Sequence, residues 1–278
     1  MFKILKKEAL NPTVSKMELS APEISRSVKA GQFIILRVDE KGERIPLTVF
    51  DCNPEKGSIE IIYQKVGTST LKLDKKCEGE QILDLVGPLG KPSHIEEGTK
   101  AIVVAGGVGT AVAYPIAKEI KNKNGRARVI LGFRNKDLII LDGPMKQIDA
   151  SARIVTDDGS NGDRGFVTDA LSEELSKNPS CDMVIAIGPI PMMNAVCKVT
   201  QKCKVKTIVS MNSIMIDGTG MCGGCRLKVD GKIKFACIDG PDFDGHKVDF
   251  EEASTRNRNF IEEETKSREK YCNLFKGV

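Results

Sequence analysis

The pattern of hydrophobic residues changes near residue 98, and this change constrains the fold more than any other feature of the sequence. Downstream of it, apolar runs such as AIVVAGGVG and RARVILGF alternate with segments of helical spacing up to about residue 210. Such alternation predicts a parallel sheet with helices on its faces, which binds ligands at the carboxyl ends of its strands. The first ninety-odd residues instead contain short apolar runs between turn residues, which predicts a small antiparallel barrel or sandwich.

The length of 278 residues suits two domains and an appendage. We predict a barrel over residues 1–97 and an α/β nucleotide-binding domain over 98–210. A small glycine- and cysteine-rich domain follows over 211–250. The charged remainder, 251–278, is predicted to be a helix with a solvated face.

Composition excludes several classes of function. The net charge of +4 is small and the basic residues are scattered, so we expect no nucleic acid partner. No apolar run approaches the roughly 20 residues of a membrane helix, and the stretch MFKILKKEALNP lacks the apolar core of a signal peptide. We therefore expect a cytoplasmic protein without a membrane partner. Only two histidines occur, which disfavours a histidine-based hydrolase, and no catalytic acid, base or nucleophile is predicted.

Three of the nine cysteines form a cluster in the sequence DGTGMCGGC, with a further FAC after a short hairpin. The spacing is D-x₄-C-x₂-C with a distant Cys, whereas a plant-type [2Fe–2S] site has C-x₄-C-x₂-C and a distant Cys. Glycines let such a loop curl around a cluster and aim N–H groups at its sulfurs. We predict a [2Fe–2S] site whose ligands are Asp217, Cys222, Cys225 and Cys237.

Two points about this cluster stay open at the level of sequence. The first ligand is a carboxylate, which can bind iron but is harder than a thiolate, so Asp239 and His246 are alternative fourth ligands. Three cysteines and one further ligand also suit structural zinc. Zinc sites usually pair one C-x₂-C with a second close pair, and Cys237 stands alone, so iron–sulfur is favoured.

Two strand–turn–helix junctions are candidate phosphate sites. AIVVAGGVGTA brings a strand into Gly106, Gly107, Gly109 and Thr110, where glycines allow a pyrophosphate to approach the backbone and a helix begins. It is not the G-x-G-x-x-G fingerprint, and no acidic residue follows about 20 positions later. In the barrel, IIYQKVGTST leads into a second such turn, whose candidate residues are Gly67, Thr68, Ser69 and Thr70. Upstream, Arg44 and Thr48 in RIPLT supply a cation and a hydroxyl.

The order RIPLT, VGTSTL, GGVGTA and DGTGMCGGC…FACIDGPDF resembles the small (alpha) subunit of NADH-dependent ferredoxin–NADP oxidoreductase, also called the sulfide dehydrogenase small subunit. The resemblance covers essentially the whole chain. The electron-transfer subunit of dihydroorotate dehydrogenase is a more distant relative that normally has Cys where this chain has Asp217. The resemblance implies a ferredoxin-reductase-like fold: a Greek-key flavin barrel, a doubly wound parallel-sheet nucleotide domain and a small [2Fe–2S] domain.

The resemblance also implies which residues hold each cofactor. FAD would be bound by Arg44, Pro46, Leu47, Thr48, Ile62, Tyr63, Gly67, Thr68, Ser69 and Thr70. Tyr63 would line the flavin together with Ile62, through backbone and side chain. NAD(H) would be bound by Gly106, Gly107, Gly109, Thr110, Asp157, Asp158, Gly188, Pro189 and Met192. Arg134 follows a strand, so a preference for NADH over NADPH stays open.

The implied activity is electron transfer between NAD(H), FAD and the [2Fe–2S] cluster. The flavin links a two-electron carrier to a one-electron carrier, and the cofactors supply the chemistry. The implied partner is a larger flavin and [4Fe–4S] subunit that binds NADPH, with ferredoxin reached through an electron-bifurcating heterodimer. The alternatives are an electron-transfer subunit of dihydroorotate dehydrogenase and, as a non-enzyme, a zinc-stabilised nucleotide-binding module.

Overall fold

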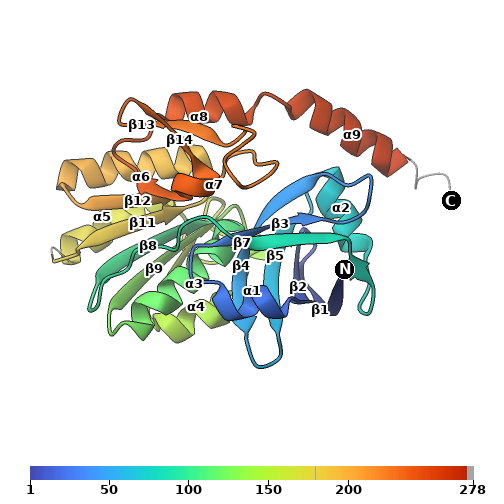
Figure 1. Ribbon diagram of the computed structural model, residues 1–278. Coiled ribbons are helices and arrows are strands. Elements are labelled where there is room, and N and C mark those ends of the chain that lie inside the picture. Colours follow the sequence, from blue (N-terminus) through green and yellow to red (C-terminus); the bar gives the residue numbers. More distant parts are fainter. Residues whose placement is uncertain (179, 274–278) are drawn as a thin grey trace.

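The computed structural model describes residues 1–178 and 180–273. The last five residues of the predicted C-terminal helix, 274–278, lie outside the described residues. The N-terminal part forms a nearly closed antiparallel sheet in the order β6-β1-β2-β5-β4-β3-β7 (Figure 1). Its elements are β1 (Phe2–Asn11), β2 (Val14–Ser20), α1 (Pro22–Ser27), β3 (Phe33–Arg37), β4 (Arg44–Asn53), β5 (Ser58–Gln64), α2 (Thr68–Lys75), β6 (Gln81–Ile82) and β7 (Asp84–Leu89).

Side chains of the barrel strands alternate between its interior and the rest of the molecule. On β5, Ile59, Ile61 and Tyr63 lie in the barrel core, whereas Ile62 packs with the helices of the following domain. This alternation follows from the two-residue period of a strand. Leu73 of α2 closes the same core.

The second part is a six-stranded sheet in the order β10-β9-β8-β11-β12-β15. Five strands are parallel, and β15 pairs antiparallel with β12 at the edge. The elements up to β12 are β8 (Lys100–Gly106), α3 (Gly109–Asn122), β9 (Arg126–Phe133), the 3₁₀ turn η1 (Lys136–Leu138), α4 (Asp142–Ile148), β10 (Arg153–Thr156), α5 (Val167–Lys177), β11 (Met183–Ile187), α6 (Ile190–Cys203) and β12 (Lys206–Ser210). The predicted α/β architecture is confirmed.

The chain then leaves the sheet, forms the cysteine loop and a two-stranded hairpin, and returns to the sheet edge. Its elements are β13 (Arg226–Val229), β14 (Lys232–Phe235), α7 (Ala236–Asp239), β15 (Asp242–Asp244), α8 (Phe250–Asn257) and α9 (Ile261–Asn273). The predicted single C-terminal helix is two helices, separated by a turn over 258–260. Phe250 and Ala253 anchor α8, whereas α9 has no buried residue.

The three parts pack into one body. Phe33 and Ile35 of the barrel share a hydrophobic core with the sheet and with Cys225 and Cys237. On the other side of the sheet, Phe50 of the barrel stacks on Tyr114 of α3, with ring centroids 4.7 Å apart. The barrel therefore meets the nucleotide-binding sheet and the cysteine loop through apolar contacts, which fixes their relative positions.

Candidate functional site

The predicted cluster ligands lie on a loop that packs directly on the barrel. Gly218 has φ +75°, and a Cβ there would lie 2.6 Å from Cδ1 of Leu89 and 2.9 Å from Cγ1 of Ile35. Only glycine combines this left-handed conformation with so close an approach. The loop therefore begins against strands β3 and β7, and β3 is the neighbour of strand β4, which carries the RIPLT motif.

Two of the three predicted cysteine ligands are adjacent and buried. The Sγ atoms of Cys225 and Cys237 are 3.2 Å apart, and the Cys237 N–H donates to Cys225 Sγ at 3.4 Å. Thiolates that share one tetrahedral metal with bonds of about 2.3 Å would be separated by roughly 3.8 Å, so little movement is needed. Cys222 lies on the exposed side of the loop, where its Sγ accepts the Gly224 N–H at 3.4 Å.

The buried pair holds its protons in the chain without a metal. Burial, followed by the hydrogen bond and charge of Cys225, raises the pKa of the Cys237 thiol to about 12. The thiol is therefore protonated at neutral pH until a metal displaces the proton. Backbone N–H groups aimed at the sulfurs suit bound thiolates, so these residues fit an iron–sulfur cluster.

Asp217 organises the loop that carries the cysteines. Its Oδ1 accepts the Thr219 N–H at 2.9 Å and its Oδ2 accepts the Cys222 N–H at 2.8 Å. The Thr219 N–H is the main cause that holds the pKa of this carboxyl below its usual range. The group is thus a carboxylate with lone pairs left on both oxygens, which is the form that can ligate iron.

The two alternative fourth ligands have other partners. Asp239 accepts the Phe235 N–H at 2.8 Å, and His246 Nε2 lies 3.0 Å from Thr200 Oγ1 beneath α6. Within the described part of the chain, no three His, Cys, Asp or Glu side chains are arranged to hold a single metal ion.

Strand β4 presents the RIPLT residues on two faces of the barrel. Paired residues of antiparallel strands share a face. Pro46 pairs with Ile35 and Thr48 pairs with Phe33, so both lie on the face toward the cysteine loop and the sheet. Leu47 packs against the barrel core instead. Arg44 stands at the strand start, with Nη2 at 4.0 Å from Asp84 Oδ2.

The side chain of Tyr63 lies inside the barrel. Its ring is 1% exposed, and its hydroxyl donates to Asp74 Oδ1 at 3.2 Å. Desolvation and the Asp74 charge raise its pKa far above the usual value. Only the backbone of Tyr63 is therefore available to a ligand outside the barrel core.

The turn before α2 has the features of a phosphate site. The Thr70 hydroxyl accepts the N–H groups of Val66 and Gly67 at 3.1 Å and so holds the turn itself. The Ser69 hydroxyl donates to Glu43 Oε2 at 3.2 Å, and Thr68 is the first helical residue. A Cβ at Gly67 would meet nothing within 4 Å, which leaves open space at the helix N-terminus, where anions bind.

The residues predicted to bind NAD(H) meet at the carboxyl ends of β8 and β11. Met192 lies between the two strand ends: its Sδ would be 2.5 Å from a Cβ at Gly106, and its Cε 2.9 Å from one at Gly188. Gly107 has φ +55° and open space beside it, which fits a pyrophosphate. Thr110 Oγ1 is buried and has no hydrogen-bond partner among residues 1–178 and 180–273.

Asp157 and Asp158 lie at the ends of the neighbouring strands β9 and β10. The Asp157 N–H donates to Phe133 O and the Asp158 N–H donates to Arg134 O. The Asp158 carboxylate caps its own turn, where the Ser160 hydroxyl and N–H lower its pKa. Both aspartates and Arg134 are thus gathered at the outer end of the predicted nucleotide site.

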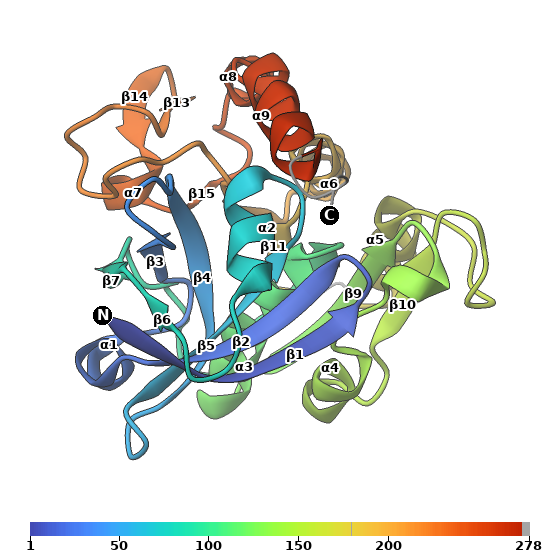
Figure 2. The same cartoon turned by 90° about the vertical axis from the view of Figure 1, so that its right-hand side faces the viewer.

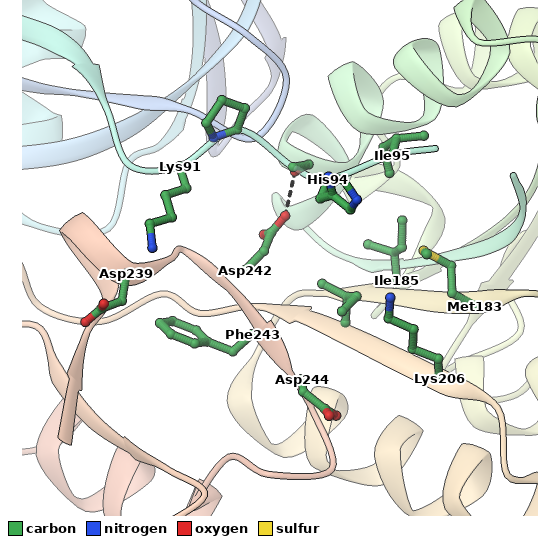
Figure 3. Close-up of a pocket in the computed structure, with 13 residues that line it drawn as sticks. Lys91, His94, Ile95, Met183, Ile185, Lys206, Asp239, Asp242, Phe243 and Asp244 are labelled. Carbon is green, nitrogen blue, oxygen red and sulfur yellow. Dashed lines mark hydrogen bonds between the residues drawn. The ribbon is translucent and has the colours of Figure 1, made fainter. Parts of the chain in front are cut away.

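Sequence reasoning missed a cavity between the interdomain linker and the sheet edge (Figure 3). The cavity has a volume of about 220 Å³, and its lining includes Lys91, His94, Lys206 and Asp242. Asp242 Oδ2 accepts the Ser93 hydroxyl at 2.5 Å, whereas its buried Oδ1 has no partner in the described part of the chain. This contact ties the linker of the barrel to β15, and no local sequence signal marks it, because its partners are 149 residues apart.

Burial raises the pKa of Asp242, opposed by the hydroxyls of Ser93 and Ser210. The folded state therefore holds this proton more tightly than the unfolded state, so its contribution to stability is complete below pH ~3.8 and is lost as pH rises through the folded pKa. We expect Asp242→Asn to lose this dependence. The melting temperature of the variant minus that of the wild type should therefore increase as the pH rises from about 4 to about 8. Thermal unfolding at several pH values measures the difference, with Asp244→Asn as the matched control. A constant difference across this range would contradict the assignment.

The comparisons with known proteins agree with this geometry. Residues 212–249 match the iron–sulfur cluster binding domain of dihydroorotate dehydrogenase B, and residues 103–198 match the oxidoreductase NAD-binding domain. A solved cytochrome P450 reductase from Amycolatopsis, at 20% identity and TM-score 0.60, shares the fold over 73% of this chain and 65% of its own. The fold and site therefore define a ferredoxin-reductase-like oxidoreductase, and the predicted fold class is confirmed.

The chain belongs to the family of dihydroorotate dehydrogenase B electron transfer subunits and their homologues. A homologue of that subunit from Thermotoga maritima is 44% identical over 96% of this chain and 94% of its own. The subunit from Desulforamulus reducens is 31% identical over 90% of this chain and 97% of its own. The predicted resemblance is confirmed by a solved structure of the NADH-dependent reduced ferredoxin-NADP oxidoreductase, with 42% identity, TM-score 0.92 and 98% coverage of both chains.

The family fixes the class of chemistry. This chain is an oxidoreductase subunit for electron transfer with a NAD-binding domain and an iron–sulfur domain. The predicted cofactor set of FAD, an iron–sulfur cluster and NAD(H) is in accord with the two domains and with the flavin-based enzyme whose structure it resembles. No helix in the described ranges combines the length and the apolar character needed to span a bilayer.

Proposed function

We propose that this chain is the NAD(H)-binding, electron-transfer subunit of a heterodimeric, electron-bifurcating NADH-dependent ferredoxin:NADP oxidoreductase in the cytoplasm. The solved enzyme of that name is 42% identical over 98% of this chain, whereas the dihydroorotate dehydrogenase subunit from Desulforamulus reducens is 31% identical over 90% of it. Asp217 at the first ligand position supports the same assignment. All nine cysteines are free, which is in keeping with a reducing compartment.

The packing of Gly218 on Ile35 is the observation that carries the proposal. Ile35 pairs with Pro46, so the predicted cluster loop and the predicted flavin strand are neighbours within one packed core. We propose that Arg44, Pro46, Leu47 and Thr48, the backbone of Ile62 and Tyr63, and the turn over 67–70 hold FAD. Asp217, Cys222, Cys225 and Cys237 would hold a [2Fe–2S] cluster.

NAD(H) would enter at the carboxyl ends of β8 and β11. Gly106, Gly107, Gly109 and Thr110 would receive its pyrophosphate, with Gly188, Pro189 and Met192 beside it and Asp157 and Asp158 at the outer end. When bound, the flavin exchanges a hydride with the nicotinamide and single electrons with the cluster. The residues of the chain bind, orient and enclose these groups, and none is assigned a proton transfer.

The surface around the cluster loop supports a protein partner. Ile216, Met221 and Ile238 lie on or beside the loop with exposed fractions of 56%, 88% and 45%. Exposed apolar side chains grouped at one place mark interaction sites in soluble proteins. We propose that the larger flavin and [4Fe–4S] subunit, which binds NADPH, covers this loop, and that ferredoxin reacts through that subunit.

A co-purification and activity assay tests the assignment. The chain would be produced together with the large subunit encoded by the neighbouring reading frame. The complex would then be assayed with NADH, NADP⁺ and reduced ferredoxin. We expect reduction of NADP⁺ that requires both NADH and reduced ferredoxin. The domain match to dihydroorotate dehydrogenase B supports one second candidate, so dihydroorotate is assayed in parallel. Reduction of NAD⁺ by dihydroorotate, without ferredoxin-dependent activity, would overturn the proposal in favour of that candidate.

A further inference from the structure

Helix α9 leaves the cysteine domain and crosses to the barrel, where it lies beside α2 (Figures 1 and 2). It has no buried residue, and its sequence IEEETKSREKYCN is mostly charged. Such a helix gains little from hydrophobic packing, which normally supplies most of a helix's stability in a protein. Its position over α2 therefore depends on specific contacts.

Two contacts attach α9 to opposite ends of α2. The hydroxyls of Ser267 and Thr68 are 3.0 Å apart, and Lys75 Nζ lies 4.9 Å from the centre of the Tyr271 ring. Thr68 is the first residue of α2 and Lys75 is the last. Helix α9 thus runs along the whole of α2, and Ser267 stands at the turn proposed to bind the FAD pyrophosphate.

This contact reaches the phosphate-binding turn itself. The first N–H groups of α2 have no partner within the helix, and the open space at Gly67 lies next to them. The hydroxyls of Thr70 and Ser69 are already hydrogen-bonded within the barrel. Thr68 is therefore the hydroxyl of this turn that α9 can orient, and Ser267 is its partner.

We propose that α9 is a strap that retains the flavin: Ser267 positions the Thr68 hydroxyl at the pyrophosphate turn, and Tyr271 anchors the strap on Lys75. The inference rests on the proposed FAD site and adds to it a segment 199 residues away in the sequence. Ser267 is a positioning residue, because it acts through Thr68. The strap would slow the release of FAD without contributing to the NAD(H) site.

The test measures FAD affinity by flavin fluorescence in the full chain after removal and return of the flavin. A hydrogen bond contributes about 1 kcal/mol, so we expect Ser267→Ala to raise the Kd for FAD about fivefold. A cation–π contact contributes about 0.5–1 kcal/mol, so the double variant with Tyr271→Ala is expected to exceed roughly tenfold. Ser267→Thr should restore the wild-type Kd. The matched control is Ser172→Ala, an exposed helical serine whose hydroxyl donates to Thr168 O of its own helix.

The outcomes separate the strap from the site. A wild-type chain that binds FAD, together with an unchanged Kd in the double variant, would overturn the strap and leave the proposed function standing. A wild-type chain that takes up no FAD would overturn both. Equal weakening in Ser172→Ala, or failure of Ser267→Thr to restore binding, would overturn the positioning role. The Kd for NADH is expected to stay within about twofold of the wild type in every variant, because α9 does not reach that site.

Discussion

Replacing Cys225 by alanine is expected to remove the iron–sulfur cluster from this chain. The Cys225 thiol is buried 3.2 Å from that of Cys237, and alanine has no atom that can bind iron in its place. Iron should fall from about two atoms per chain, as a [2Fe–2S] site requires, to well below one. Reduction by NADH of acceptors that receive electrons from the cluster should fall by more than roughly 100-fold, since even outer-shell partners of metal ligands contribute 10–100-fold.

The matched control for this variant is Cys197→Ala. Cys197 is 5% exposed and belongs to the same hydrophobic core, but its sulfur packs near Gly245, away from the loop. Both variants create a similar small cavity, so their stabilities should fall by similar amounts. Iron, sulfide and visible absorption should be normal in Cys197→Ala. Two irons in Cys225→Ala would contradict the ligand assignment.

Replacing Gly107 by alanine is expected to weaken NADH binding by tenfold or more, about 1.4 kcal/mol. A Cβ at Gly107 meets no protein atom within 4 Å, so it would enter the space assigned to the pyrophosphate. The φ of +55° adds a strain of about 1–2 kcal/mol for any side chain. Equilibrium titration with NADH, followed by flavin bleaching, measures the effect.

The matched control is Gly98→Ala. Gly98 has φ +72° and also has no atom within 4 Å of a Cβ, but it precedes β8 at the opposite end of that strand. The two variants therefore share the backbone strain and differ in position alone. A loss of NADH affinity of the same size in both would show that strain, and not occupation of the pyrophosphate space, causes the effect.

The order of strands and helices was predictable because it depends on local periodicity. Apolar runs of five to eight residues and helical segments alternate from residue 98 onward, and the structure has β8 to β12 there. Helix α3 begins at Gly109, directly after the glycine turn, as the strand–turn–helix junction predicted. The N-terminal strands β1 and β2 were harder to predict, because charged residues interrupt their apolar pattern and half of the residues of β1 are exposed.

The candidate site was predictable where its chemistry lies in one short motif. The spacing from Asp217 to Cys225 indicated the cluster loop, and the glycines after β8 indicated the nucleotide turn. Contacts between distant segments left no such signal. Ser93 with Asp242 and Thr68 with Ser267 are pairs of common polar residues, and only the packing of barrel, sheet and C-terminal helices brings them together.

The orientation of Tyr63 differs from what the family resemblance implies for its side chain. By that resemblance, Ile62 and Tyr63 line the flavin through backbone and side chain. The two-residue period sends neighbours to opposite faces, and Asp74 of α2 binds the Tyr63 hydroxyl inside the barrel. Register against β4 was needed to decide which residue faces outward, and register depends on turn geometry and packing.

The central claim is that one chain carries both a hydride acceptor and a one-electron centre, and an anaerobic NADH titration tests it most directly. The purified chain would be titrated while its visible spectrum and electron paramagnetic resonance are recorded, with iron, sulfide and zinc counted beforehand. We predict flavin absorption near ~450 nm that bleaches with NADH, about two irons per chain, and a paramagnetic signal from the reduced cluster. A colourless, zinc-containing protein that does not respond to NADH would contradict the account.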